Sequence, residues 1–197
     1  PRAVRLMRWC DRAWNEGGDY FPDEAYYSVW MFFPYVYDPG KEEPWEPGDG
    51  GWWNVFQFKS ENEAGSHPLV ELDVYNENSS MFFGLSTKEY PDPESDVHQQ
   101  AYHVQLEPEP IPISSWMHVE VFYRKAQDSS GEVVVWQDGR EIFRIERIQT
   151  MLTETAAWGI GNYTDHITGG AVPGQAVVFF DDAVISGERV GQIIASP

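Results

Sequence analysis

Apolar and polar residues alternate along much of this chain, which is the pattern of half-buried β-strands. The clearest example covers residues 116–143 and predicts three strands, with turns over 128–131 and at Asp138-Gly139. Asp-Gly between alternating runs is a strong hairpin signal, because a type I′ turn needs positive φ at both of its central residues. We therefore predict a three-stranded meander at this point of the chain.

Similar runs recur at short intervals, and no segment has the period of a long amphipathic helix. We expect further strands over residues 3–9, 26–33, 52–59, 69–75, 81–85, 101–106, 156–162 and 177–185. A short helix or turn is expected over 149–155, and a long surface loop over 38–51. Because no linker or repeat divides the 197 residues, the pattern predicts a single all-β domain over 1–197, a two-sheet antiparallel sandwich.

Four of the runs separate an apolar row from a polar row. In the run 52–59 we expect Trp52, Phe56 and Phe58 to face the core. The polar rows of the four runs contain Gln57 and Lys59; Glu71, Asp73 and Tyr75; His103; and His118, Glu120 and Arg124. If these strands are neighbours in one sheet, the rows form a continuous ligand-binding surface. The alternative is an ordinary solvated sheet face.

Composition narrows the choice of ligand. Aromatic residues make up 15% of the chain, with 9 Trp and 10 Tyr, which is more than a core requires and suits sugar binding. The formal net charge of −19 argues against nucleic acid and against an anionic membrane surface as partners. It also weakens the case for a highly charged polyanion, unless basic groups gather locally. No apolar run is long enough to cross a bilayer. Cys10 is the only cysteine and is expected to be inert.

The order of motifs resembles the jelly-roll polysaccharide lyases of the alginate-lyase and heparin-lyase type, in the concanavalin A-like superfamily. The matching segments are 26–34, 54–59, 116–143, 158–163 and 180–186. The resemblance implies a jelly roll that is extracellular or periplasmic. It also implies action on a polysaccharide or oligosaccharide, by β-elimination at a uronate.

In those lyases, a strand that contacts the uronate carries the motif Gln-x-His, in which x is any residue. Gln57 matches the Gln, whereas Lys59 stands where the His would be, and His103 is the candidate replacement for it. The Tyr of a late Gly-x-Tyr strand, which acts as acid or base, is matched by Tyr163.

The same lyases use an Arg on an early strand, for which Arg8 is the candidate and Arg5 the alternative. Elimination needs a base for a weakly acidic carbon proton and neutralisation of the adjacent carboxylate. The resemblance therefore implies Lys59 and Arg8 at the carboxylate and Tyr163 as the group that transfers the proton.

Two other functions stay open. Residues 71–77 resemble the Glu-x-Asp-x-Glu strand of laminarinase-type glycosidases, but Glu71 and Glu77 would be about 20 Å apart along a regular strand. Only Glu71 and Asp73 are close enough to work as a pair in that reaction. A non-catalytic glycan-binding module would need only the polar sheet face and exposed aromatic rings.

Metal binding is also open. In the concanavalin A-like superfamily that the chain resembles, a carboxylate near the position of Asp181 often binds a structural Ca²⁺. Two adjacent acids, Asp181 and Asp182, do not by themselves specify a site. The five His residues lack zinc-site spacing, and the chain has neither a Gly-rich phosphate loop nor a Gly-x-Ser-x-Gly elbow.

Overall fold

The computed structural model describes residues 2–9, 22–40, 51–63, 65–92, 94–95 and 97–191, without the side chains of Arg2 and Trp9. These residues form strands and loops, with no helix. The strands are β1 (Arg2–Trp9), β2 (Glu24–Phe32), β3 (Tyr37–Asp38), β4 (Trp53–Asn62), β5 (Gly65–Glu77), β6 (Ser80–Glu89), β7 (Gln99–His103), β8 (Trp116–Arg124), β9 (Gly131–Gln137), β10 (Arg140–Ile148), β11 (Ala156–Thr164), β12 (Thr168–Gly169) and β13 (Phe179–Ser186).

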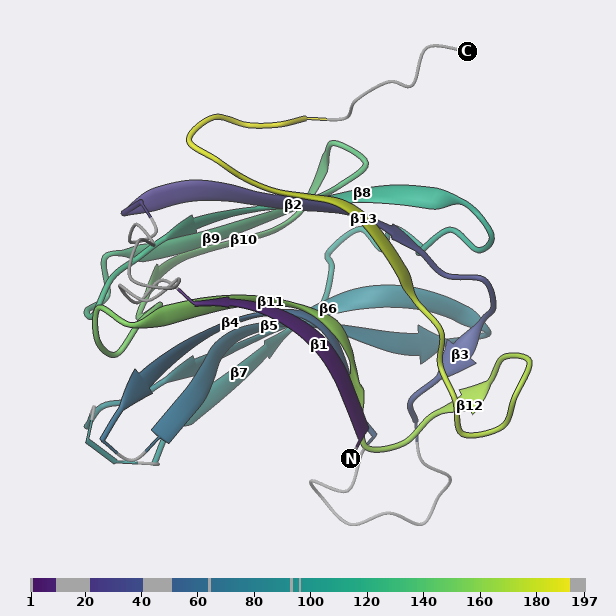
Figure 1. Cartoon of the computed structure of the whole chain (residues 1–197), viewed down its shortest axis with the longest axis horizontal. Helices are drawn as coiled ribbons and strands as arrows, with labels where there is room; N and C mark the ends of the chain where they lie inside the picture. The colour runs from purple at the N-terminus through teal and green to yellow at the C-terminus, as the bar shows by residue number, and fades with distance from the viewer. Residues whose placement is uncertain are drawn as a thin grey trace.

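Two large sheets are stacked face to face. One has the order β1-β11-β4-β5-β6-β7 and the other the order β10-β9-β8-β2-β13, while β12 and β3 form a small ribbon. Neighbouring strands within them pair antiparallel. Figure 1 shows that the six-stranded sheet is arched, with the ends of its strands bent away from the other sheet. The predicted two-sheet jelly roll is confirmed.

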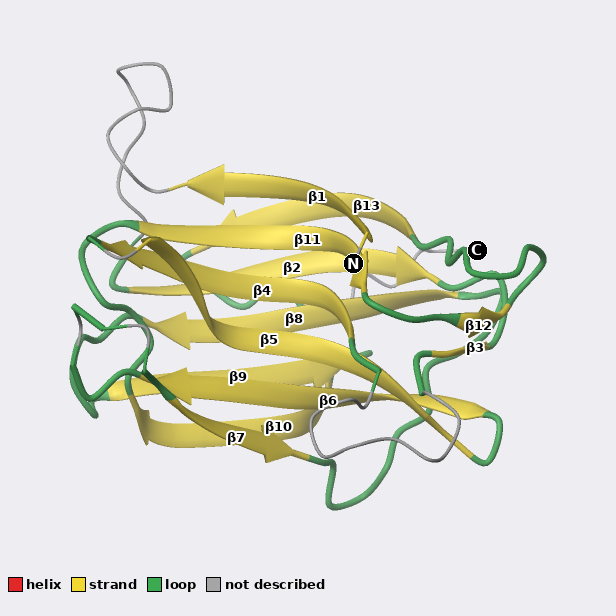
Figure 2. Ribbon diagram, turned by 90° about the horizontal axis from the view of Figure 1, so that it is seen from below, coloured by secondary structure: helices red, strands yellow, loops and turns green. Residues whose placement is uncertain are grey.

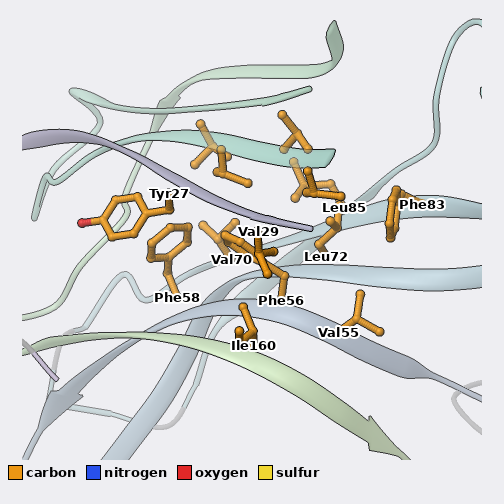
Figure 3. Close-up of a cluster of buried hydrophobic side chains, with 14 of the residues drawn as sticks. Tyr27, Val29, Val55, Phe56, Phe58, Val70, Leu72, Phe83, Leu85 and Ile160 are labelled. Atoms are coloured by element: carbon orange, nitrogen blue, oxygen red, sulfur yellow. The ribbon is translucent and has the colours of Figure 1, made fainter. Parts of the chain in front are cut away.

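The core lies between the sheets and is built from the apolar rows. Tyr27 and Val29 of β2 point toward Phe56 and Phe58 of β4, and all four are buried (Figure 3). The ring of Phe58 also stacks on the ring of Tyr123 from β8, with centroids 3.8 Å apart. Burial of large aromatic side chains on both inner faces holds the two sheets together.

The meander is present as β8, β9 and β10. Its last turn has φ of 49° at Asp138 and 83° at Gly139, so both central residues adopt the positive φ that the Asp-Gly signal requires. A local sequence signal therefore predicted this part of the fold correctly.

A β-bulge in β4 changes which tryptophan enters the core. The register between β4 and β5 shifts between Asn54 and Phe56, so the simple alternation of the strand is interrupted there. Trp53 is consequently buried, and its indole N–H donates to Asn162 Oδ1 at 2.8 Å. The expectation that Trp52 shares the core face with Phe56 is wrong for this reason.

The segment 149–155 is a loop rather than a helix. Ser60 Oγ accepts hydrogen bonds from the backbone N–H groups of Leu152 and Thr153, which ties the loop to β4. Residues 41–50 of the expected surface loop, and Cys10, lie outside the described residues. Within the described part, no helix is long and apolar enough to cross a membrane.

Candidate active site

Polar side chains gather on the outer face of the six-stranded sheet, meaning the side turned away from the second sheet. Because paired residues of neighbouring strands project to the same side, the strand register identifies which residues share this face. One row crosses the whole sheet through Met7, Gly159, Gln57, Glu71, Ser86 and Tyr102. A neighbouring row contains Ala3, Tyr163, Asn54, Asp73 and Gly84. Figure 2 views the sheet from this side.

Tyr163 lies on this face beside a cation. The guanidinium carbon of Arg5 is 4.3 Å from the centroid of the Tyr163 ring, and the ring of Trp52 meets Tyr163 edge-on with centroids 4.5 Å apart. Arg5 reaches this position because its partner on β11 is Gly161. A Cβ on Gly161 would lie 2.8 Å from Arg5 Cγ, so the glycine leaves the space that the arginine crosses.

Gln57 lies nearby, under the side chain of Met7. Its amide N is 3.8 Å from Met7 Sδ, and the residue is buried. A Cβ on Gly159 would overlap Met7 Sδ and approach Gln57 Cγ to 3.3 Å. The two glycines of β11 therefore let side chains of the edge strand β1 lie across β11 toward β4.

Lys59 follows Gln57 on the same face of β4, paired with Ala157. Burial lowers the pKa of Lys59, and the positive charge of Arg5 lowers it further, while Glu71 and Glu61 act in the opposite direction. Lys59, Arg5 and Glu71 therefore interact electrostatically. Through Arg5, the candidate residues Tyr163 and Lys59 belong to one group of side chains.

Two carboxyl groups occupy the neighbouring strand β5. Glu71 Oε2 accepts a hydrogen bond from Lys88 Nζ at 2.6 Å, and the two groups form an ion pair. Burial raises the pKa of Asp73 to about 8, and the negative charge of Glu71 adds to the shift, while a hydrogen bond from Asn54 opposes it. Asp73 therefore keeps its proton at neutral pH, whereas Glu71 is held beside a cation.

Aromatic rings continue the face beyond the carboxyl groups. Tyr75 of β5 stacks on Phe82 of β6, with ring centroids 5.6 Å apart. The hydroxyl of Tyr102 lies directly over Gly84, where a Cβ would overlap it. Burial and the nearby Asp73 raise the pKa of Tyr102, so this hydroxyl remains a neutral donor.

His103 does not join this group. It pairs with Leu85, whose side chain is in the core, so it points to the inner side of the edge strand β7. Its Nε2 lies 3.0 Å from Thr87 Oγ1, and burial lowers its pKa. The alternation of Tyr102, Val104 and Leu106 predicts a core-facing row, but Tyr102 of β7 faces outward, and Val104 and Leu106, which follow the strand, are exposed. His103 as the replacement for the missing His on this face is therefore a wrong prediction.

Arg8 also lies away from the outer face. It pairs with Trp158, a core residue, and so projects to the inner side of β1. Arg5, three residues earlier, has the opposite orientation and contacts Tyr163. Of the two candidates, Arg5 is therefore the arginine that shares the outer face with Tyr163, and the choice of Arg8 is corrected.

His118, Glu120 and Arg124 belong to β8, which lies in the five-stranded sheet. Glu120 is buried there and bonds Arg189 Nε at 2.8 Å, while the His118 ring packs 5.1 Å from the ring of Trp30. These three side chains are therefore on the opposite sheet. The expectation of one surface built from four polar rows is wrong for this strand, because β8 pairs with β2 and β9 rather than with β5.

Comparison with known proteins identifies the family of this chain. A family model described as polysaccharide lyase matches residues 15–184. The chain belongs to this polysaccharide lyase family. A search of curated protein sequences finds no match.

Solved lyase structures share the fold. An endo-β-1,4-glucuronan lyase from the fungus Trichoderma reesei is 14% identical with a TM-score of 0.65, over 94% of this chain and 75% of that one. Alginate lyase PA1167 from Pseudomonas aeruginosa is 13% identical with a TM-score of 0.56, over 93% of this chain and 82% of that one. A variant of the alginate lyase Aly36B in complex with alginate trisaccharide is 14% identical with a TM-score of 0.51, over 95% and 82% of the two chains.

The predicted metal position is exposed. Asp181 lies beside the bulge of β13, and its Oδ1 accepts the backbone N–H of Asp182 at 2.9 Å. Among the described side chains, no group of three or more His, Cys, Asp or Glu residues is placed to hold a metal ion. These carboxylates alone do not form the oxygen-rich cage that Ca²⁺ requires. A structural Ca²⁺ at Asp181 stays a prediction.

Several residues of this face were missing from the predicted site, namely Asn54, Lys88 and Tyr102. Tyr102 alternates with Val104 and Leu106, and this pattern predicts that it faces the core. The one local signal was Gly84, since a glycine inside a strand often marks the close approach of another group. Lys88 carries no such local signal, because its pairing with Glu71 depends on which strands are neighbours.

Proposed function

We propose that this lyase-family chain cleaves a uronate-containing polysaccharide by β-elimination on the outer face of the six-stranded sheet. The observation that carries the proposal is the gathering of Tyr163, Arg5, Gln57 and Lys59 on adjacent strands of that face. A hydroxyl able to exchange a proton, an amide and two cations are the groups that such an elimination needs. Membership of a polysaccharide lyase family supports the assignment.

The cations would act on the sugar carboxylate. Removing the proton at C5 places negative charge on the carbon and, by delocalisation, on the attached carboxylate. Arg5 and Lys59 stabilise that charge, and the Gln57 amide donates a hydrogen bond that orients the group. Since Gln57 lies beneath Met7, substrate binding is expected to displace the flexible methionine side chain.

Tyr163 would transfer the proton. The C5–H bond breaks, the C4–C5 double bond forms, and the C4–O bond breaks with a proton delivered to the leaving oxygen. A single hydroxyl can exchange a proton with either atom when both lie within hydrogen-bond reach. The guanidinium of Arg5 lies over the Tyr163 ring, beside the group that would transfer the proton.

The test is a screen of uronate polymers and neutral glucans with two readings on each sample. The proposal expects new reducing ends together with the ultraviolet absorbance of an unsaturated uronate. Reducing ends without that absorbance would indicate a glycosidase, for which Glu71 and Asp73 are the candidate pair. Binding without any product would indicate a glycan-binding module. Either result overturns the proposal.

A further inference from the structure

Cationic side chains are unevenly distributed over the outer face. Arg5 on β1 and Lys59 on β4 lie on one half of the sheet, where Arg5 contacts the Tyr163 ring and Lys59 interacts electrostatically with Arg5, Glu71 and Glu61 without a close ion pair to any described side chain. The other half is formed by β5, β6 and β7. Among the described side chains of these three strands, Lys88 is the only Lys or Arg. Its ammonium is committed to Glu71 at 2.6 Å, and both side chains are largely buried. The second half therefore offers no uncommitted positive charge within the described residues.

The second half instead offers acids and neutral groups. Glu71 is paired with Lys88, and Asp73 is a carboxyl group that becomes negative as the pH rises. The remaining outward groups include the rings of Tyr75, Phe82 and Tyr102. Aromatic rings and neutral hydroxyls suit an uncharged sugar, because they contact its apolar face and pair its hydroxyls without needing a counter-charge.

The two halves are far enough apart to meet different sugars. Strands β4 and β6 are separated by β5, which places them about 10 Å apart at the usual spacing of neighbouring strands. A second carboxylate over β5 and β6 would lack a cation and would face Glu71. Glu71 and a sugar carboxylate bound over these strands would be close together, and salt does not fully screen the repulsion between partly buried charges. The net charge of −19 on the whole chain adds to this repulsion.

From this arrangement we propose that the site prefers a glycan in which a uronate is followed by an uncharged sugar, with the uronate at Arg5 and Lys59 and the neutral sugar over β5 to β7. The inference rests on the proposed function and adds the substrate class to it. A homopolymer of uronates would place its next carboxylate on the half of the face that has no free cation among the described side chains.

The experiment compares two substrates on the whole chain. One is a homopolymer of β-1,4-linked glucuronate, and the other is a polysaccharide in which glucuronate alternates with a neutral sugar. We expect kcat/KM for unsaturated product to be at least about tenfold higher on the alternating polymer, which corresponds to about 1.4 kcal/mol. Equal or faster cleavage of the homopolymer overturns this inference alone. No unsaturated product from any uronate polymer overturns the proposed function itself.

Two variants test the charge argument. Glu71→Gln releases Lys88 from its partner. Gln100→Lys adds a cation on exposed β7 opposite Lys88, removes the hydrogen bond from Gln100 to Ser86 Oγ, and leaves both Lys88 and Glu71 in the chain. Both are expected to shift the ratio of kcat/KM toward the homopolymer. The second variant keeps the test valid if the first does not fold.

The matched control is Glu146→Gln, which removes one exposed negative charge from β10 on the other sheet. It is expected to leave the substrate ratio unchanged. If the ratio does not move in Gln100→Lys, or if it moves equally in the control, the placement of the neutral sugar is wrong.

Discussion

At the residue scale, the site depends on how neighbours change the charge state of individual groups. Lys59 and Asp73 are both shifted toward their neutral forms by burial, in opposite directions on the pH scale. The charge of Arg5 lowers the pKa of Lys59 further, and the charge of Glu71 raises the pKa of Asp73 further. Such perturbed groups are frequent at functional sites, although ion-pair networks produce them as well.

Replacing Tyr163 with Phe removes the hydroxyl and keeps the ring that Arg5 and Trp52 contact. We expect kcat to fall by about 10²–10⁴-fold, the usual contribution of a positioned acid or base. Initial rates on the best uronate polymer measure the effect. Tyr26→Phe, on the outer side of the five-stranded sheet, is the control and should keep full activity. An unchanged rate in Tyr163→Phe would remove this residue from the mechanism.

Asp73 should give stability a specific pH dependence. Its folded pKa of about 8 is above the ordinary value of 3.8, so the unfolded chain releases this proton first as the pH rises. The unfolded state is therefore favoured progressively between about pH 4 and pH 8, and the effect is constant above that range. Asp73→Asn should be more stable than the natural chain, with an advantage that grows over this interval. Urea unfolding at several pH values measures it, and an advantage independent of pH would contradict the assignment.

At the element scale, the site is assembled by strand pairing, and the glycines of β11 are essential to it. Gly159 and Gly161 face two side chains of β1 at positions where any Cβ would overlap or crowd them. Glycine inside a strand weakens the strand, because it has no side chain to pack and costs more conformational entropy on folding. Here the loss creates the space in which Arg5 and Met7 reach toward the centre of the sheet.

Gly161→Ala tests this role. The new Cβ would lie 2.8 Å from Arg5 Cγ and close to the backbone of Val4, so β1 or its arginine must move. We expect a loss of about 1–3 kcal/mol in stability, as for other overpacked sites, together with reduced activity. Gly187→Ala is the control, because a Cβ at that position would meet no other described residue within 4 Å and the φ of Gly187 is ordinary. Equal effects of the two substitutions on denaturation midpoint and rate would contradict the packing argument.

At the scale of the whole molecule, the two sheets separate different tasks. The six-stranded sheet carries the candidate active site on its outer face. The five-stranded sheet carries its own buried polar groups, where Glu120 accepts hydrogen bonds from the backbone of Val190 and Gly191 as well as from Arg189. Those contacts fasten the segment after β13 to the sheet opposite the site, which is a structural role for Glu120.

The net charge of −19 should make stability depend on salt. Repulsion among the acidic groups disfavours the compact state, and added salt screens it. We therefore expect the midpoint of thermal unfolding to rise when sodium chloride is increased at neutral pH. Near the isoelectric point the same addition should have little effect. A midpoint that falls or stays constant at neutral pH would show that the charges are already balanced locally.

Local sequence patterns were enough to predict most of the strands, the Asp-Gly turn, the sandwich and the placement of Gln57 and Lys59 on one polar row. These features follow from period-two alternation and turn chemistry, which act over a few residues. Only the three-dimensional structure shows which strands are neighbours in each sheet. That arrangement put β8 in the other sheet, replaced Arg8 by Arg5, turned His103 inward and paired Lys88 with Glu71. Each of these depends on strand pairing, bulges or an edge position, and the residues involved are distant in the chain.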